Sequence, residues 1–86
     1  MYLHLGQDVV VPSRTIVGIF DIENTSISKI TKEFLGSEEK LHHVINVSME
    51  LPKSFVICRE KGENVVYISQ ISCATLKKRA AAGNRE

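Results

Sequence analysis

The sequence predicts a small α+β domain, in which one mainly antiparallel, twisted sheet carries an amphipathic helix on one face. Two late segments, 55–59 and 65–69, are apolar and rich in β-branched residues, and a compact turn separates them. A third apolar segment covers residues 15–20. Between it and the late segments, apolar residues recur at helical spacing over 27–35. The predicted order is β-β-β-α-β-β-β-α.

The N-terminal residues predict a hairpin followed by the central strand. Residues 2–5 and 9–11 flank a turn, and the second arm ends at Pro12, which cannot donate to a sheet ladder. Both the odd- and the even-numbered residues of segment 15–20 are apolar, so we expect the strand to be buried on both faces of the sheet. Gly18 marks a point where another backbone or a large side chain comes close.

The middle of the chain predicts the amphipathic helix and a weaker strand. Residues 24–26 offer three side chains that cap a helix N-terminus, and Gly36 favours the helix end. Such a helix is too short to be stable alone in water, so its apolar side has to lie on the sheet. Residues 41–47 form a strand that two adjacent histidines interrupt.

The C-terminal residues predict a hairpin and a closing helix. The turn at 61–64 contains Gly62 and Asn64, two residues that tolerate positive φ. Ser72 is the predicted N-cap, and Ile71 and Leu76 occupy staple positions on either side of it. We expect one domain over residues 1–79 and a disordered tail over residues 80–86.

Composition restricts the functional classes. The chain has 86 residues and two cysteines, too few for a disulfide framework, so oligomerisation is the favoured support for so small a core. Residues 1–12 lack the pattern of a signal peptide, and no apolar run reaches the roughly 18 residues of a membrane span. We therefore expect a cytoplasmic protein with reduced thiols and no membrane partner.

Charge is divided unevenly along the chain. Residues 1–52 carry four Lys/Arg and seven Asp/Glu (4 − 7 = −3), whereas residues 53–86 carry seven and three (7 − 3 = +4). This division is typical of a polyanionic partner, of head-to-tail self-association, or of an ordinary solvated surface. The basic run Lys77, Lys78 and Arg79 either complements the end of the closing helix or contacts phosphate.

Catalysis and metal binding have little support in the sequence. Cys58, Cys73, His42 and His43 match no usual zinc-ligand spacing, so we expect no metal and no cofactor. Cys73 follows the predicted cap, where its thiol is either activated or simply a small apolar residue. No nucleophile–base–orienter set is visible, and we expect a binding protein that is not an enzyme.

Arg14 is the most informative basic residue. It lies between Pro12 and the strand 15–20, at the mouth of a strand and not on a solvated helix. An arginine there either pairs with a carboxylate or is presented to an anion, because guanidinium groups serve both roles.

Two stretches resemble a known family. The opening MYLHLGQDVVVPSRTIVGIFDIENT and the later FVICREKGENVVYISQIS are similar to the bacterial extracellular-matrix regulators of the RemA/RemB type, closest to the RemB branch. The resemblance covers residues 1–79. It implies a cytoplasmic transcription regulator of biofilm-matrix genes that binds DNA with weak sequence preference. It also implies a homo-oligomer, since RemA-type members assemble into rings that present basic residues to DNA.

The resemblance implies phosphate contacts through Arg14 and Lys53, with Lys29 or Lys32 in addition. RemA-like chains also carry an adjacent arginine pair before the late strand and a proline before the helix. Here an acid and an apolar residue, Glu50 and Leu51, stand in place of the pair, and a serine replaces the proline. These departures motivate an alternative: an assembly or adaptor protein that binds another protein, such as a RemA-like paralogue.

Overall fold

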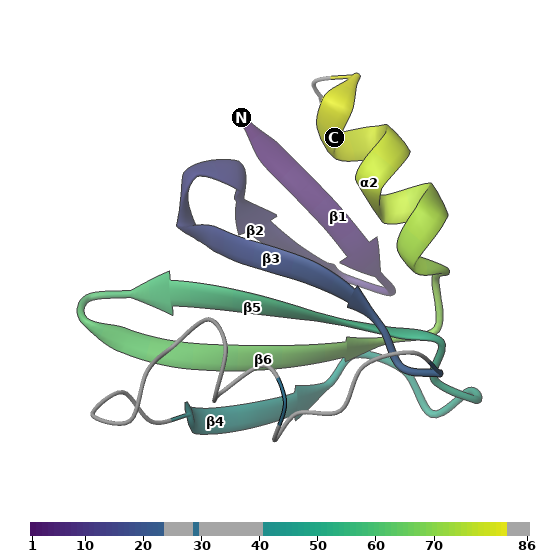
Figure 1. Cartoon of the computed structure of the whole chain (residues 1–86), viewed down its shortest axis with the longest axis horizontal. Helices are drawn as coiled ribbons and strands as arrows, with labels where there is room; N and C mark the ends of the chain where they lie inside the picture. The colour runs from purple at the N-terminus through teal and green to yellow at the C-terminus, as the bar shows by residue number, and fades with distance from the viewer. Residues whose placement is uncertain (24–28, 30–40, 83–86) are drawn as a thin grey trace.

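The computed structural model describes residues 1–23, 29 and 41–82, and within them the protein is α+β (Figure 1). The elements are β1 (Tyr2–Gly6), β2 (Val9–Pro12), the short 3-10 helix η1 (Ser13–Thr15), β3 (Ile16–Asp21), β4 (Leu41–Asn46), β5 (Ser54–Glu60), β6 (Glu63–Ser69) and α2 (Cys73–Ala81). The predicted helix after residue 24 lies outside the described residues, apart from Lys29.

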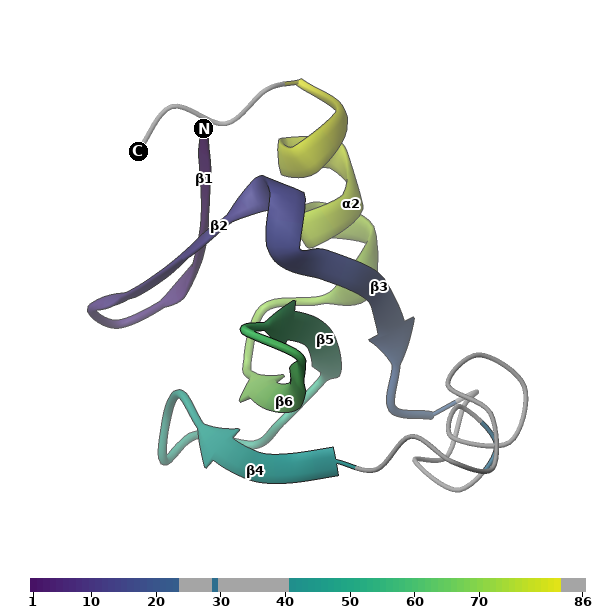
Figure 2. The same cartoon turned by 90° about the vertical axis from the view of Figure 1, so that its left-hand side faces the viewer.

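The strands form two sheets, so the prediction of a single sheet was wrong. β1 and β2 pair only with each other, and the larger sheet has the order β3-β5-β6-β4. Within that sheet β4 runs parallel to β6, whereas β5 is antiparallel to both β3 and β6. Figure 2 shows α2 and the β1–β2 hairpin on one side of β5 and β6, with β4 on the opposite side. β1 and β2 share one buried cluster with β5 but pair with no strand of the larger sheet, so the hairpin covers the sheet and does not extend it.

β3 lies at an edge of the larger sheet, which corrects the prediction that it is central. None of its side chains is fully buried, and Val17 is 42% exposed. Both sets of alternating residues in β3 are apolar because Ile16 and Ile19 pack against one buried cluster and Phe20 packs against a second one. A strand can have apolar contacts on both of its faces and still pair with a neighbouring strand along only one of its two edges. The central positions belong to β5 and β6.

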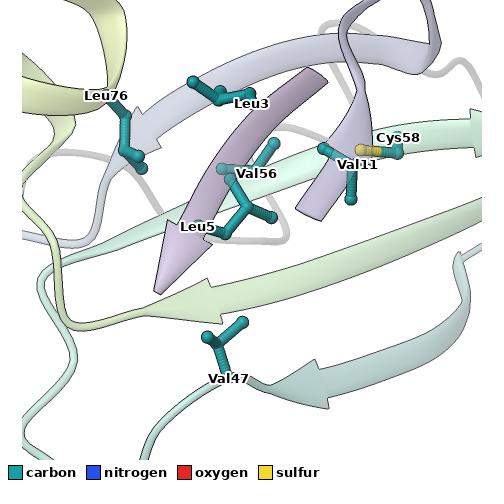
Figure 3. Close-up of a cluster of buried hydrophobic side chains, with 7 residues drawn as sticks. All are labelled: Leu3, Leu5, Val11, Val47, Val56, Cys58 and Leu76. Carbon is teal, nitrogen blue, oxygen red and sulfur yellow. The ribbon is translucent and has the colours of Figure 1, made fainter. Parts of the chain in front are cut away.

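The main core lies between the larger sheet and its cover. Its buried residues come from β1, β2, β5, α2 and the position after β4: Leu3, Leu5, Val11, Val47, Val56, Cys58 and Leu76 (Figure 3). A second cluster of Phe55, Ile57 and Val66 occupies the other face, where the rings of Phe20 and Phe55 lie 5.8 Å apart. Burying each large apolar side chain contributes about 1.5–3 kcal/mol. The close approach predicted at Gly18 is confirmed, because a side-chain carbon there would overlap the ring of Phe20.

Two serines fix the connection between β6 and α2. Ser54 and Ser69 face each other across β5 and β6. The Ser54 hydroxyl donates to the Ile71 carbonyl at 2.7 Å, and Ser69 Oγ accepts the Ile71 N–H at 3.0 Å. The Ser69 hydroxyl also donates to the Leu5 carbonyl at 2.6 Å. The same pair of side chains therefore holds the hairpin and the helix to the sheet.

The closing helix begins as predicted. Ser72 Oγ accepts the N–H of Thr75 at 3.2 Å, which confirms Ser72 as the N-cap. The helix continues through Ala81, two residues beyond the predicted end of the domain at residue 79. No helix within the part of the chain that the structure describes is long and apolar enough to span a membrane.

Candidate functional site

Arg14 is presented by a short, fixed turn. Pro12 ends β2, and the Thr15 hydroxyl donates to the Pro12 carbonyl at 2.7 Å, which closes the 3-10 helix η1. The Ser13 N–H donates to the Met1 carbonyl at 2.9 Å. Arg14 stands between these anchored residues with its side chain exposed to solvent. The backbone that carries the guanidinium is therefore held in place while the side chain remains accessible.

The antiparallel pairing of β3 with β5 brings Arg14 beside the β5–β6 turn. Ile16 pairs with Cys58, so residues just before Ile16 lie beside residues just after Cys58. Figure 1 shows the β2–β3 connection and the β5–β6 turn at the same end of the molecule. An open groove of about 400 Å³ lies between them, and we call it the Arg14 groove; it is lined by Pro12, Arg14, Thr15, Arg59, Glu60 and Lys61.

The β5 wall of this groove carries Arg59 and Glu60. Arg59 Nε donates to Asn64 Oδ1 at 3.2 Å, and Asn64 is the residue opposite it on β6. Glu60 accepts a hydrogen bond from the Tyr67 hydroxyl at 3.3 Å. Burial of Tyr67, together with the negative charge of Glu60, raises the pKa of Tyr67 to about 12. At neutral pH the phenol is therefore a stable donor that engages the Glu60 carboxylate.

Lys61 forms the end of the groove in an uncommon conformation. Lys61 and Gly62 have φ values of 53° and 81°, and together they make the two-residue turn that joins β5 to β6. Both values are those of a type I′ turn, in which Asn or Asp usually precedes Gly. The prediction that Gly62 takes positive φ is confirmed. The same expectation for Asn64 was wrong, because Asn64 is 3% exposed and lies in β6.

The groove is cationic. Three basic side chains face one carboxylate, that of Glu60. Within the described residues, no hydrogen bond or ion pair engages the side chain of Arg14. Of the two roles that the sequence leaves open for Arg14, this environment favours presentation to an anion over pairing with a carboxylate.

Lys53 lies at the opposite end of β5 from the groove. It immediately precedes β5, and its N–H donates to the Ser69 carbonyl at 2.9 Å. It borders a separate hollow of about 300 Å³ with Asp21, Glu23 and the first turn of α2. Because β5 has seven residues, Arg14 and Lys53 are separated by about 20 Å of strand. One copy of the chain does not bring these two predicted residues together.

Of the two remaining predicted phosphate contacts, the structure describes only Lys29. The structure describes Lys29 as exposed but places it in neither hollow, and Lys32 lies outside the described residues.

Both cysteines are buried thiols. Burial is the main cause that raises the pKa of the Cys58 thiol to about 11. Cys73 Sγ donates to the Ile19 carbonyl at 3.6 Å, and the residue belongs to the buried face of α2. Among the residues that the structure describes, no three His, Cys, Asp or Glu side chains are grouped as metal ligands. The surroundings of Cys58 and Cys73 are those of cysteines that pack in a core.

A second surface feature lies along β4 and the connection that follows it. Val44 and Ile45 are exposed on this edge strand, and Met49 and Leu51 are 103% and 81% exposed. We call these four residues the β4 patch. An edge strand with apolar, exposed side chains is a surface on which another chain can pair.

Comparison with known proteins gives a family match over nearly the whole chain. The model of the RemA-like family, extracellular matrix regulatory protein A-like, matches residues 2–80. The chain is also 44% identical over 80 residues to extracellular matrix regulatory protein B of Bacillus subtilis (strain 168). That alignment covers 93% of this chain and 90% of the relative. No solved structure matches the chain.

Proposed function

The chain belongs to the RemA-like family of extracellular matrix regulatory proteins, and on this premise we propose that it is a bacterial, cytoplasmic transcription regulator that binds DNA and controls biofilm-matrix genes. The observation that carries the proposal is the exposed Arg14 guanidinium, which meets no carboxylate partner within the described residues. A side chain of this kind on a fixed backbone suits a phosphate of the DNA backbone. Such contacts carry no sequence information, so the sequence preference is weak.

The activity we propose is binding without catalysis. The described residues contain no nucleophile with an adjacent base, and the raised pKa keeps the Cys58 thiol protonated at neutral pH. The chemistry of the Arg14 groove is electrostatic. It suits the retention of a polyanion.

We propose further that the active form is a homo-oligomer. Head-to-tail contacts that repeat around a closed axis would make this oligomer a ring. Arg14 and Lys53 mark opposite ends of β5 in one copy. Head-to-tail assembly would bring the Arg14 end of one copy close to the Lys53 end of the next. A single DNA backbone would then contact both residues, and we propose Lys29 or Lys32 as a further phosphate contact. The exposed β4 patch supports assembly because it offers apolar area to a second copy.

The test is fluorescence anisotropy of a labelled genomic duplex titrated with the purified protein at several salt concentrations. We expect binding with a steep negative salt slope, weakened on all duplexes by Arg14→Ala and by Lys53→Ala. Lys77→Ala, an exposed lysine outside both hollows, is the matched control for loss of one charge. Absence of binding by the unmodified protein at low salt would contradict the proposal.

The β4 patch also favours a second candidate function, that of an adaptor whose partner is a RemA-like paralogue. Val44→Lys places a charge in the patch and should abolish a complex with the purified paralogue in size-exclusion chromatography with light scattering. The candidate fails if the unmodified protein and the paralogue elute separately at micromolar concentration. It also fails if a pull-down recovers nucleic acid and no protein.

A further inference from the structure

We propose that Arg59 and Lys61 bind DNA phosphates together with Arg14, so that the Arg14 groove is a three-cation site for successive phosphodiesters of one strand. The inference deepens the proposed function and rests on it, since it takes DNA as the anion. It assigns a role to Arg59 and Lys61, two basic residues beside the β5–β6 turn.

The three cations come from different elements and meet at one groove. Arg14 belongs to η1, Arg59 to β5 and Lys61 to the turn that follows β5. Arg59 and Lys61 line the groove from β5 and from the turn that follows it, while Arg14 lines it from η1. Successive phosphates of one DNA strand advance by about 3.4 Å along the duplex axis, so cations from separate elements that line one groove can contact neighbouring phosphates of that strand.

The site is organised before any ligand arrives. The Thr15 hydroxyl fixes the backbone under Arg14 by its bond to Pro12, and the amide of the buried Asn64 fixes the guanidinium of Arg59 at Nε. The carboxylate of Glu60 is engaged by the Tyr67 hydroxyl on β6. The groove thus combines one positioned guanidinium, that of Arg59, with a fixed backbone under Arg14, and both lower the entropic cost of holding a phosphate.

Lys61 gives an independent reason to assign a role to the turn. Its φ of 53° lies in the left-handed region, where lysine is disfavoured and Asn, Asp or Gly is preferred. Its side chain is exposed and makes no hydrogen bond or ion pair within the described residues. Packing therefore does not account for a lysine at this position. A positive charge placed at the end of a cationic groove does account for it.

The experiment uses Lys61→Asn, because asparagine suits the turn and removes the charge. At about 0.1 M salt we expect affinity for a labelled duplex to fall about eight-fold, and the slope of log K against log salt to become shallower by about 0.9 for each protomer in contact. The same substitution should raise the midpoint of thermal unfolding, because it relieves the left-handed lysine. Loss of binding with gain of stability separates a phosphate contact from damage to the fold.

Two further variants complete the test. Arg59→Gln combined with Lys61→Asn should weaken binding about sixty-fold at the same salt concentration, with circular dichroism unchanged. Lys77→Gln, which removes one charge from the exposed side of α2, should retain both the affinity and the slope. If the unmodified protein binds DNA but the groove variants keep its affinity and slope, the three-cation site is refuted and the proposed function stands. If the unmodified protein fails to bind, the proposed function is refuted and the site with it.

Discussion

Ser69→Ala is the substitution that best tests how the fold is held together. Ser69 is completely buried in β6, and its hydroxyl donates to the Leu5 carbonyl at 2.6 Å while accepting the Ile71 N–H at 3.0 Å. The substitution removes one oxygen atom and changes the side-chain volume little. It leaves two backbone groups, one in the N-terminal hairpin and one before α2, without the partner that joins them.

The expected loss follows from these two bonds. Each hydrogen bond contributes about 1 kcal/mol net, and a buried partner left unsatisfied costs about 1–3 kcal/mol. The Leu5 bond is buried and the Ile71 bond is partly buried, so water can replace the second bond more readily than the first. We expect the free energy of unfolding to fall by about 2–4 kcal/mol. For a chain of this length, total stability is about 4–13 kcal/mol and each kcal/mol lowers the Tm by about 4–8 °C.

The assay is urea unfolding followed by circular dichroism at one fixed protein concentration, since oligomerisation would make stability depend on concentration. Ser48→Ala is the matched control, because Ser48 Oγ accepts the Glu50 N–H at 3.0 Å in an exposed turn. We expect the control to lose less than about 0.5 kcal/mol. A loss this small for Ser69→Ala as well would show that the hairpin and helix do not depend on the serine hydroxyl.

The remaining predictions concern pH and the helix. The Cys58 thiol has a pKa of about 11 when folded and 9.0 as its ordinary value, so between these values the unfolded chain binds fewer protons. Stability should therefore be full below pH 9 and fall as the pH rises toward 11, and urea unfolding of Cys58→Ala should show a flatter dependence. Leu76→Ala empties a fully buried position in the main core and should lower the free energy of unfolding by about 2–5 kcal/mol, measured by the same urea titration. Ser72→Ala removes the N-cap bond to Thr75 and should cost about 1 kcal/mol; a loss equal to that of Leu76→Ala would contradict a capping role.

Features that depend on neighbouring residues could be predicted from the sequence. The two late strands were expected at 55–59 and 65–69 and are found as β5 and β6, slightly longer at their ends. The Ser72 cap was also confirmed, because it depends on a side chain and an N–H three residues away. In each case the signal and the structure it specifies lie within the same short segment.

The arrangement of the strands could not be predicted in the same way. β3 is apolar on both parities, but its place at the sheet edge is decided by pairing with β5, some forty residues later. The separation of the β1–β2 hairpin into its own sheet depends on contacts such as that between Leu5 and Ser69. Hydrophobic patterns report which faces are covered and do not report which strand lies next to which.

The candidate site was predicted in part for the same reason. Arg14 could be singled out from its place between Pro12 and a strand, a local feature. Its grouping with Arg59 and Lys61 depends on the register between β3 and β5, as does its separation from Lys53. The sequence offered no signal for this grouping, because the pairing that places the start of segment 15–20 beside the end of segment 55–59 is known only from the structure.

The closure of the main core by both ends of the chain has a consequence for biosynthesis. The carbonyl of Leu5 is held by Ser69, 64 residues later, and the carbonyl of His4 accepts from the Arg79 guanidinium at 3.4 Å. At about 5–20 residues per second, a ribosome needs roughly 3–13 s to add the intervening residues. β1 is therefore made well before the residues that hold it, and Leu5 and His4 remain without these two contacts until Ser69 and Arg79 have been added. During this interval β1 and its hairpin partner β2 are open to chaperones and to association with other nascent chains.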